Sequence, residues 1–367
     1  MKIALLGDIA PFGRYCIHKN PDVLTQFEGV RSFLRTHDLV VGNLEVPFTD
    51  DERPAGAKSA HIRSHPKNIE LLRYLGVTHV TLANNHIGDF GLAGYRRTKA
   101  VLESAGIEWF GAEKKTIRLE LDGEKVALIG YCSLNTNPAR VGRGGVQLLN
   151  LLDVDPVLAD LQRECLDGYF PILAVHSGQE HVHTPSSEDV KFARGLASKF
   201  DYIYYGHHPH VVQGSEVIGN SVAFYSLGNF VFDDVYTSRD TANPLVRMSK
   251  ENKTGAMASL TLDGGKIASW SIVPIYLGEE RVDIGDDVVG FDAKPYNDAL
   301  AAAGTPEYDD RRAGLINDYI QSRRALRDLK WYWRRLSLNS LGIILAARKN
   351  AGEHRNMFSS KLSRLGG

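Results

Sequence analysis

The strongest constraint on the fold is an alternation of short apolar runs and helical patterns over the first 205 residues. Runs of four to six residues rich in Val, Ile and Leu are typical of buried strands. The segments between them place apolar residues at the spacing of an amphipathic helix. The expected strands are 3–6, 38–42, 77–82, 107–110, 171–175 and 201–205, and the expected helices are 66–75, 91–105, 154–166 and 186–200.

The pattern becomes β-rich after residue 205, with expected strands at 222–225, 256–262 and 266–275. Residues 117–121 and 125–131 flank Asp122-Gly123, a hairpin signal. Strand–helix alternation followed by a β-rich part favours two packed sheets with helices outside. We therefore expect an α/β fold, a four-layer α-β-β-α sandwich, over residues 1–284, with 241–284 as its β-rich C-terminal portion.

The C-terminal part differs in charge from the rest of the chain. Residues 311–367 contain 13 Lys/Arg against 3 Asp/Glu, although the whole chain has a net charge of -1. We expect a linker over 285–310 and a basic helical extension over 311–367. In residues 327–349 aromatic and aliphatic residues interleave with Lys and Arg, which could bind an anionic membrane surface. The alternative is a helix that packs on the sandwich or on another subunit of an oligomer.

Composition narrows the cellular setting. The three cysteines, Cys16, Cys132 and Cys165, are far apart, so neither a disulfide scaffold nor a thiolate zinc site is expected. The sequence shows no apolar signal core near Met1 and no run of about 18 apolar residues. We expect a cytoplasmic protein, with the inner face of the membrane as a place where it could associate. No nucleic-acid-binding motif accompanies the basic residues, so nucleic acid is not an expected partner.

Three imidazoles lie within four residues in the segment His207-His208-Pro209-His210, directly after the expected strand 201–205 and Gly206. Ligands of open α/β sheets bind outside the carboxyl ends of strands. Imidazole is the commonest metal ligand in proteins. The segment therefore indicates a metal site, and polar turn residues are the alternative interpretation.

Four other expected strands also end in polar residues. These residues are Asp8, then Asn43 and Glu45, then Asn84, Asn85 and His86, then His176 and Glu180. Taken singly, each could be a helix cap or a turn residue. Taken together, they indicate a metal centre at the carboxyl edge of the sheet. Oxygen donors mixed with imidazoles suit one or two divalent ions such as Mn, Fe, Zn or Mg, and the absence of thiolates argues against a closed structural zinc site.

These motifs, in this order, resemble the calcineurin-type metallophosphoesterase superfamily, and more closely its poly-γ-glutamate capsule biosynthesis (CapA-type) family. The resemblance covers about residues 2–235. It rests on Leu6-Gly7-Asp8, Gly42-Asn43-Leu44-Glu45, Ile62-Arg63, Leu82 to Gly91 (LANNHIGDFG), His176 to Glu180 (HSGQE), Gly206 to Gln213 (GHHPHVVQ) and Tyr225 to Asp233 (YSLGNFVFD).

The resemblance implies a ligand set for the metal ions. Asp8 and His210 would hold one ion, and Glu45 would stand where a bridging carboxylate lies. The second site would consist of Asn85, His176 and His208, with His207 as the alternative to His208. The superfamily's first two motifs, Asp-x-His and Gly-Asp-x-x-Asp, are replaced here by Asp8-Ile9-Ala10 and by Asn43-Leu44-Glu45, so a single ion or two unequal sites are both open.

The resemblance also implies catalytic and substrate-binding roles. His86 would be the general acid or would stabilise the transition state, and Asp89 would orient it. Arg63 would suit an anionic group of the substrate, or else form a surface salt bridge. The other candidates for substrate contacts are Asn84, Glu180 and Asn229, of which Asn229 could instead close a turn.

Three functions are compatible with these features. The first is metal-dependent hydrolysis of a phosphoester in capsule or other cell-envelope polymer biosynthesis. The second is metal-dependent hydrolysis of an amide or ester, or transfer, on a poly-γ-glutamate-like or capsular polymer. In both, the substrate would be an anionic small molecule or polymer. The third is a non-catalytic assembly protein of a surface-polymer machine.

Overall fold

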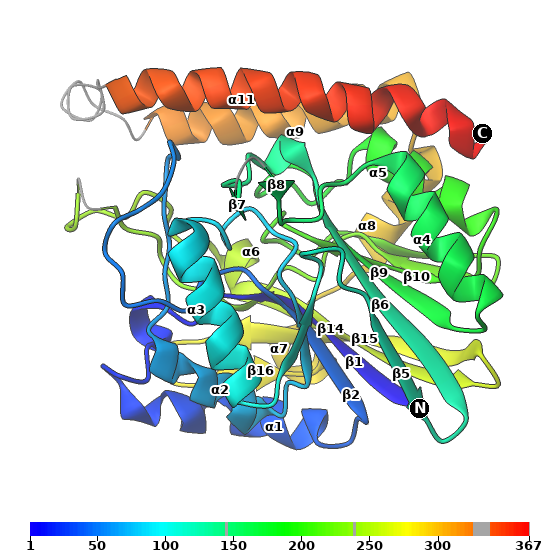
Figure 1. The fold of residues 1–367 in the computed structure, drawn as a ribbon, viewed down its shortest axis with the longest axis horizontal. Helices are drawn as coiled ribbons and strands as arrows, with labels where there is room; N and C mark the ends of the chain where they lie inside the picture. The colour runs from blue at the N-terminus through cyan, green and yellow to red at the C-terminus, as the bar shows by residue number, and fades with distance from the viewer. Residues whose placement is uncertain (144–145, 238–239, 326–337, 367) are drawn as a thin grey trace.

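Two β-sheets pack face to face in the computed structural model, which describes residues 1–143, 146–237, 240–325 and 338–366 (Figure 1). The first sheet has the order β16-β15-β14-β1-β2-β3-β4, and β13 also pairs with β1. Its strands are β1 (Lys2–Ile9), β2 (Leu39–Leu44), β3 (His79–Thr81), β4 (Glu108–Phe110), β13 (Asn229–Val231), β14 (Thr254–Asp263), β15 (Lys266–Leu277) and β16 (Val282–Ile284).

The second sheet has the order β11-β12-β10-β9-β6-β5. Its strands are β5 (Ile117–Leu121), β6 (Glu124–Cys132), β9 (Phe170–His176), β10 (Ile203–His207), β11 (Ser215–Ile218) and β12 (Ser221–Phe224). Strands β6, β9, β10 and β12 are parallel, as are β1, β2, β3 and β4 in the first sheet. A two-stranded ribbon, β7 (Gly142–Arg143) with β8 (Val146–Gln147), lies apart from both sheets.

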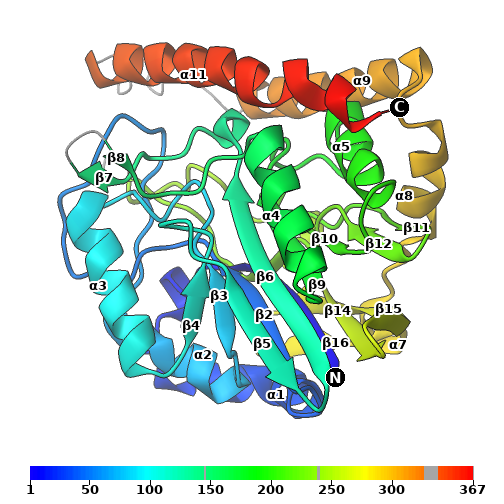
Figure 2. The same cartoon turned by 45° about the vertical axis from the view of Figure 1, so that its right-hand side comes forward.

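Helices cover both outer faces, so the expected four-layer α-β-β-α sandwich is confirmed (Figure 2). On the first sheet lie α1 (Glu28–Leu34), α2 (Ile69–Leu75) and α3 (Gly91–Ser104), and on the second lie α4 (Val154–Leu166) and α5 (Ser187–Ala197). Between the sheets, Leu5 and Val41 of the first share one buried cluster with Leu128 and Ile172 of the second. Burial of such aliphatic side chains is the main stabilising term of the sandwich.

The helices begin and end where the local sequence predicts. The side chains of Asp153 and Ser186 accept hydrogen bonds from the first turns of α4 and α5, as N-cap residues do. Helix α2 follows a turn that begins at Pro66, and it ends at Gly76, whose φ of 75° suits a residue without a Cβ. The predicted helices 66–75, 91–105, 154–166 and 186–200 therefore correspond to observed elements.

The segment expected to be a linker, 285–310, is folded against the sandwich. It contains α7 (Asp286–Val289), α8 (Lys294–Ala299) and the turn Leu300–Ala302, and then begins α9 (Pro306–Ala325). Leu300 is buried in the cluster that holds α4 and α5, and the Asn297 side chain accepts a hydrogen bond from the Ser215 amide. The glycines and prolines of this segment punctuate short helices, which explains why composition alone suggested a linker.

The C-terminal helices α9 and α11 (Leu338–Met357) lie side by side across one end of the sandwich (Figure 1). Phe358 packs on Phe192 of α5 with ring centroids 5.0 Å apart, and the Lys361 ammonium lies 2.6 Å from the Asp153 carboxylate. The end of the helical extension therefore packs on the sandwich. This was one of the two alternatives that the sequence left open, the other being a membrane-binding helix. Residues 326–337, which include Trp331 and Trp333 of the possible membrane-binding stretch, lie outside the described residues. No helix in the described part of the chain is both long and apolar enough to cross a membrane.

We expect Gly206→Ala to lower the free energy of unfolding by about 1–3 kcal/mol or more. A Cβ at position 206 would lie 2.0 Å from the Tyr225 carbonyl oxygen, in the buried contact between β10 and its neighbour. The control is Gly314→Ala in α9, where a Cβ meets nothing within 4 Å and should raise stability by about 0.5–1 kcal/mol. Urea denaturation measures both, and equal midpoints would contradict the packing argument.

Candidate metal centre

The two sheets bring their polar strand ends together at one edge. Asp8 on β1 is in register with Asn43 on β2, and His176 on β9 is in register with His207 on β10. Across the sheets, Asp8 Oδ1 lies 3.0 Å from His207 Nδ1, and Asn43 Nδ2 lies 3.3 Å from His176 Nδ1. Strand ends far apart in the sequence therefore form one cluster, as their shared position at the carboxyl edge predicted.

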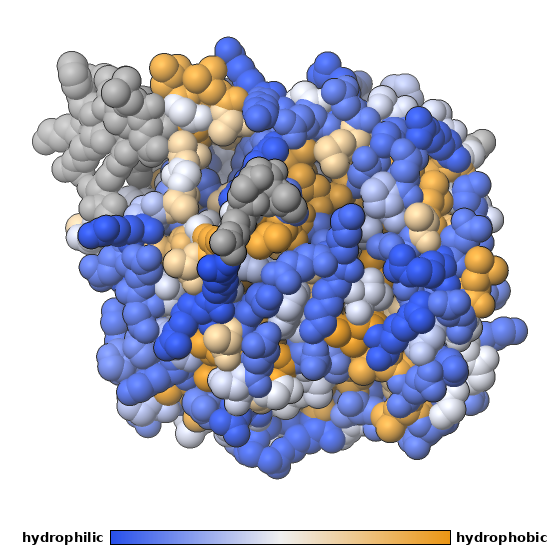
Figure 3. Space-filling view, in the orientation of Figure 1, coloured by the Kyte–Doolittle hydropathy of each residue, from blue (hydrophilic) through white to orange (hydrophobic). Residues whose placement is uncertain are grey.

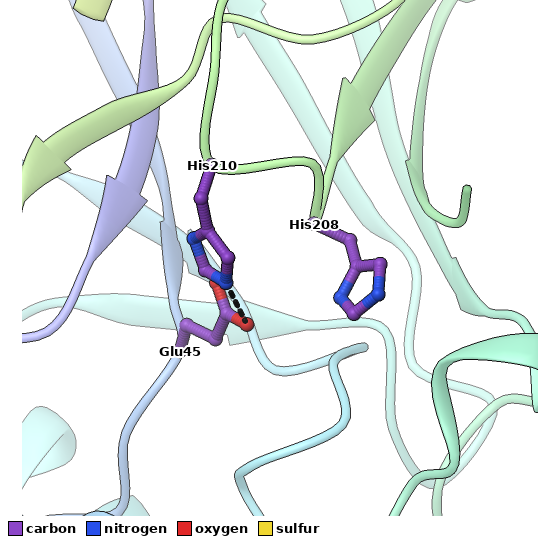
Figure 4. Close-up of side chains that lie close together, drawn as sticks. All are labelled: Glu45, His208 and His210. Carbon is purple, nitrogen blue, oxygen red and sulfur yellow. Dashed lines mark ion pairs between the residues drawn. The ribbon is translucent and has the colours of Figure 1, made fainter. Parts of the chain in front are cut away.

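Two groups of side chains in this cluster could hold an ion. The first contains Glu45, His208 and His210, and the second contains Asp8, Glu45 and His176. Within each group, one ligand atom from every residue lies within 4.8 Å of the others. Glu45 belongs to both groups, the position that a bridging carboxylate needs. Figure 4 shows Glu45 beside His210, with Glu45 Oε1 at 3.6 Å from His210 Nε2, and His208 facing the same space.

Several atoms of the cluster that could bind a metal ion are buried and have no hydrogen-bond partner among the described residues. They are both carboxylate oxygens of Glu45, Nδ1 of His208 and Nε2 of His207. A buried polar atom without a partner costs about 1–3 kcal/mol, and more when it is charged. Unpaired oxygen and nitrogen donors around a shared carboxylate are what a divalent cation would satisfy. The residues therefore fit a metal site.

Burial and mutual contacts set the charges in the cluster. Burial alone would raise the pKa of Asp8, but hydrogen bonds and charge from His207 and His210 hold that pKa well below its usual value. Burial, and then the charge of Asp8, raises the pKa of Glu45 well above its usual value. Burial opposes a charge on His210, but Glu45 and Asp8 outweigh it and raise the His210 pKa to about 10. The imidazolium of His210 thus lies between two carboxyl groups.

The other two imidazoles of the donor groups are neutral at physiological pH. Burial lowers the pKa of His208 to about 3, and it also lowers the pKa of His176 well below 6.5, with a smaller effect of His208. Neutral imidazole is the form that binds a metal ion. His207 differs from both, because its Nδ1 contacts Asp8 and it belongs to neither donor group. The geometry therefore favours His208 over His207 as the residue that faces an ion.

The histidine segment has an uncommon backbone. His208 and His210 have φ values of 99° and 56°, in the left-handed region that favours glycine. Such conformations cost about 1–3 kcal/mol each and persist where the surrounding structure fixes them. Here Asp8 Oδ2 accepts from the His208 amide at 3.3 Å, and Asn229 Oδ1 lies 2.9 Å from His210 Nδ1. The backbone is bent so that both rings point at Glu45.

His86 forms a separate hydrogen-bonded group beside the donor cluster. Its Nδ1 lies 2.7 Å from Asp89 Oδ2, as expected for an orienting carboxylate. The other Asp89 oxygen accepts from the Lys58 ammonium at 2.7 Å, and Lys58 also donates to the Asn85 carbonyl at 2.7 Å. Lys58 was not expected from the sequence, because it lies in the loop between β2 and α2, where it belongs to no periodic pattern and to none of the motifs.

A cavity of about 500 Å³ opens from the donor cluster. The predicted residues that line it are Asn85, His86, Glu180, His208 and His210. Asn85 Oδ1 lies 3.1 Å from His176 Nε2, so this amide contacts the donor groups as well as the cavity. Four of these five were predicted as metal or catalytic residues, and Glu180 as a substrate contact.

Three residues expected to contact the substrate lie outside this cavity. Arg63 donates to the Asp50 and Asp51 carbonyls and pairs with Glu52 at 2.8 Å, so the salt-bridge interpretation describes it. Asn84 is fully buried and binds Asn43, the Leu44 carbonyl and the amides of residues 86 and 87. Asn229 lies in β13 and contacts His210. Arg63 and Asn84 therefore hold loops in place, and Asn229 holds the side chain of His210.

Two further residues support the centre and were not predicted. Asn252 donates to the His210 carbonyl at 2.9 Å and lies 2.8 Å from His181 Nδ1. The His181 ring is 6.1 Å from the His210 ring. Asn252 belongs to the capping box of α6 (Lys250–Lys253), and a capping signal in the sequence says nothing about a contact with a ligand 42 residues away.

Mn²⁺ should stabilise the protein against heat, by about 2.7 kcal/mol at a hundred times its dissociation constant. Glu45→Gln should weaken Mn²⁺ binding more than about 100-fold, because Glu45 belongs to both donor groups. Even the loss of a residue that only holds a metal ligand in place lowers metal affinity by about 10–100-fold. The control is Glu124→Gln, a buried carboxylate that binds the Gly264 and Gly265 amides. Thermal denaturation with and without Mn²⁺ measures both, and an equal shift in the two variants would contradict the assignment.

Comparison with known proteins gives a consistent picture. The model of the family "Bacterial capsule synthesis protein PGA_cap" matches residues 2–234. The PGA biosynthesis protein CapA of Bacillus subtilis is 29% identical over 279 residues, which cover 72% of this chain and 71% of that protein. The capsule biosynthesis protein CapA of Bacillus anthracis is 28% identical over 230 residues, which cover 59% of this chain and 56% of that protein.

Among solved structures, a hypothetical protein from Thermus thermophilus aligns with a TM-score of 0.44 at 18% identity, over 78% of this chain and 100% of the other. The NAD nucleotidase of Haemophilus influenzae aligns with a TM-score of 0.42 at 14% identity, over 89% and 60%. The family assignment rests on the sequence match, which spans more than half of the chain and contains the donor residues from Asp8 to His210. The protein belongs to the family of bacterial capsule synthesis proteins described by the PGA_cap model.

Proposed function

We propose that this protein is a metal-dependent hydrolase of phosphoester bonds that acts in the biosynthesis of a capsule or another cell-envelope polymer. The observation that carries the proposal is the shared cavity: His208 and His210 of the donor groups and the oriented His86 line the same space, and Nδ1 of His208 has no hydrogen-bond partner among the described residues. The name of the family supports the biological setting.

The residues that would hold the ion or ions are Asp8, Glu45, Asn85, His176, His208 and His210, and His210 would bind in its neutral form, after loss of its imidazolium proton. A divalent ion such as Mn, Fe, Zn or Mg would polarise an oxygen of the scissile group and lower the pKa of bound water. Asn43 and His207 hold Asp8 from two sides, at 2.8 Å and 3.0 Å from its Oδ1. Asn229 holds His210 in the same way. These contacts fix the donors before substrate binds.

His86 would move a proton at its Nε2 atom. Burial, and then the charge of Lys58, lowers the pKa of His86 below 6.5, so the ring is mainly neutral at pH 7. In this neutral form Nδ1 carries the proton and donates a hydrogen bond to Asp89 Oδ2. The Nε2 atom then has no partner among the described residues. An anionic substrate in the cavity would favour a proton on Nε2, from which it can pass to the leaving group.

Lys58 is a positioning residue in this scheme. Its contacts with Asp89 and with the Asn85 carbonyl join the loop before α2 to the turn that carries Asn85 and His86. The Ile62 amide also donates to Asp89 at 2.8 Å. The carboxylate that orients His86 is therefore itself held by two groups from the same loop.

The second candidate is hydrolysis or transfer at an amide or ester of a poly-γ-glutamate-like polymer. The names of relatives favour it: one is a PGA biosynthesis protein, and another, from Mycobacterium tuberculosis, is a probable polyglutamine synthesis accessory protein. The donor cluster would suit a carbonyl oxygen as well as a phosphoryl oxygen. A non-catalytic assembly protein is the third candidate.

His86→Ala should lower kcat on a phosphoester by about 10²–10⁴-fold, the usual contribution of a positioned acid or base. The metal content should not change, since His86 belongs to neither donor group. His18→Ala, at an exposed position, is the control and should leave both quantities unchanged. Steady-state kinetics and mass-spectrometric metal analysis test this, and loss of metal in His86→Ala would overturn the role.

The Mn²⁺-loaded protein should hydrolyse phosphomonoesters or phosphodiesters, and Glu45→Gln should abolish this activity. A screen of both classes together with γ-glutamyl amides separates the candidates. Turnover of amides alone would replace the phosphoesterase by the second candidate. Absence of both metal binding and turnover, with retention of envelope-synthesis proteins in a pull-down, would favour the assembly protein.

A further inference from the structure

The cavity that opens from the metal centre has an apolar half. Its polar lining includes Asn85, His86, His208 and His210, and its apolar lining includes Phe232, Val235, Val246, Met248, Ile343 and Ala347. Phe232, Val235 and Met248 are buried. Pockets of this size that combine an apolar wall with a few convergent polar groups are typical of small-molecule sites.

Apart from Phe232, the residues of the apolar wall lie beyond the family match, which ends at residue 234. Val246 and Met248 precede α6, and Ile343 and Ala347 lie one turn apart on α11. The opposite side of α11 faces outward, where Leu341 and Leu345 are 55% and 56% exposed. Figure 3 shows hydrophobic residues on the first turns of this helix. The helix is therefore apolar on both sides, and one of them faces the cavity.

Helix α9 joins this wall to the metal centre. The Arg323 guanidinium donates to the Leu245 carbonyl, next to Val246. The Tyr319 ring lies 4.9 Å from the His181 ring, and His181 contacts the Asn252 amide that binds the His210 carbonyl. Helix α9 thus contacts both the segment of the wall next to Val246 and the residues that support His210.

Cationic side chains also line the cavity. Lys58, Arg140 and Lys349 lie along it. Arg140 pairs with Glu353 of α11 at 2.6 Å, so part of its charge is balanced there. Lys58 pairs with Asp89 at 2.7 Å and Lys349 lies 3.9 Å from Glu353, so these charges are balanced as well, and the Glu180 carboxylate lines the same cavity. A divalent ion at the donor cluster would supply the positive charge that favours a substrate with an anionic reacting end.

We propose that the substrate is an amphiphile: a phosphoester whose anionic group lies at the donor cluster and whose alkyl or prenyl-like substituent lies against Val246, Met248 and Ile343. This inference rests on the proposed function, which it makes more specific. Each methylene buried against such a wall adds about fourfold to affinity, equivalent to about 0.8 kcal/mol.

The test uses alkylphosphonates, which carry the anionic group but cannot be hydrolysed as phosphoesters. Binding of methylphosphonate and butylphosphonate to the full-length Mn²⁺-loaded protein is measured by titration calorimetry. Butylphosphonate should bind at least about tenfold more tightly, allowing for incomplete burial of its three added methylenes. Equal affinities would overturn the apolar subsite. Failure of methylphosphonate itself to bind would refute the proposed phosphoesterase site, and with it this inference.

Two wall variants and one control locate the effect. Ile343→Asn and the isosteric Val246→Thr should each reduce the butyl-to-methyl affinity ratio by about threefold or more, with methylphosphonate affinity unchanged. Leu345→Asn, two residues from Ile343 but on the exposed side of α11, should keep the wild-type ratio. An unchanged ratio in both wall variants, or an equal loss in Leu345→Asn, would overturn the inference.

Discussion

The burial of two carboxyl groups side by side, Asp8 and Glu45, is the constraint on which the rest of the site depends. Both are fully buried, and an uncompensated buried charge costs several kcal/mol. Asp8 is compensated by Asn43, His207 and His210, but neither oxygen of Glu45 has a hydrogen-bond partner among the described residues. The charge on Glu45 is therefore relieved by a proton, in line with its raised pKa, by the His210 imidazolium or by a bound cation. This requirement explains why several imidazoles gather here, and why two of them adopt strained backbone conformations.

The sandwich makes this burial geometrically simple. Parallel strands end at the same edge of their sheet, and the two sheets here present those edges to each other. Asp8, near the end of β1, then meets His207, the last residue of β10 in the other sheet, although 199 positions separate the two residues. The supporting amides Asn43 and Asn229 also come from strands that flank β1. The donor cluster is thus held by strand register, which leaves the loops free to form the cavity.

Sequence patterns were sufficient where a local rule governs the structure. Apolar runs, caps and helical spacing predicted most strands and helices, and the position of Asp8, Glu45, His176 and His208 after strands predicted that they would meet. Lys58, Asn252 and His181 were missed because their roles depend on contacts between loops, for which no periodicity exists. Arg63 had two interpretations in the sequence, a substrate contact or a surface salt bridge, and its contacts with residues 50–52 match the second. The segment 285–310 contains the turn residues of a linker, and only tertiary packing buries Leu300.

The structure separates the groups that would perform the reaction from those that would select the substrate. The donors and His86 belong to the part of the chain that matches the family, whereas Ile343, Val246 and Met248 lie beyond it. Hydrogen bonds and charge hold the donors in place. A substitution of one donor leaves a buried polar group without a partner and lowers the free energy of unfolding. Apolar side chains that line a cavity carry no such cost, because replacement by another apolar residue leaves no polar atom unpaired. A C-terminal extension that contacts the centre at few points, such as Tyr319 on His181, can therefore vary in shape while the buried carboxylates keep their environment.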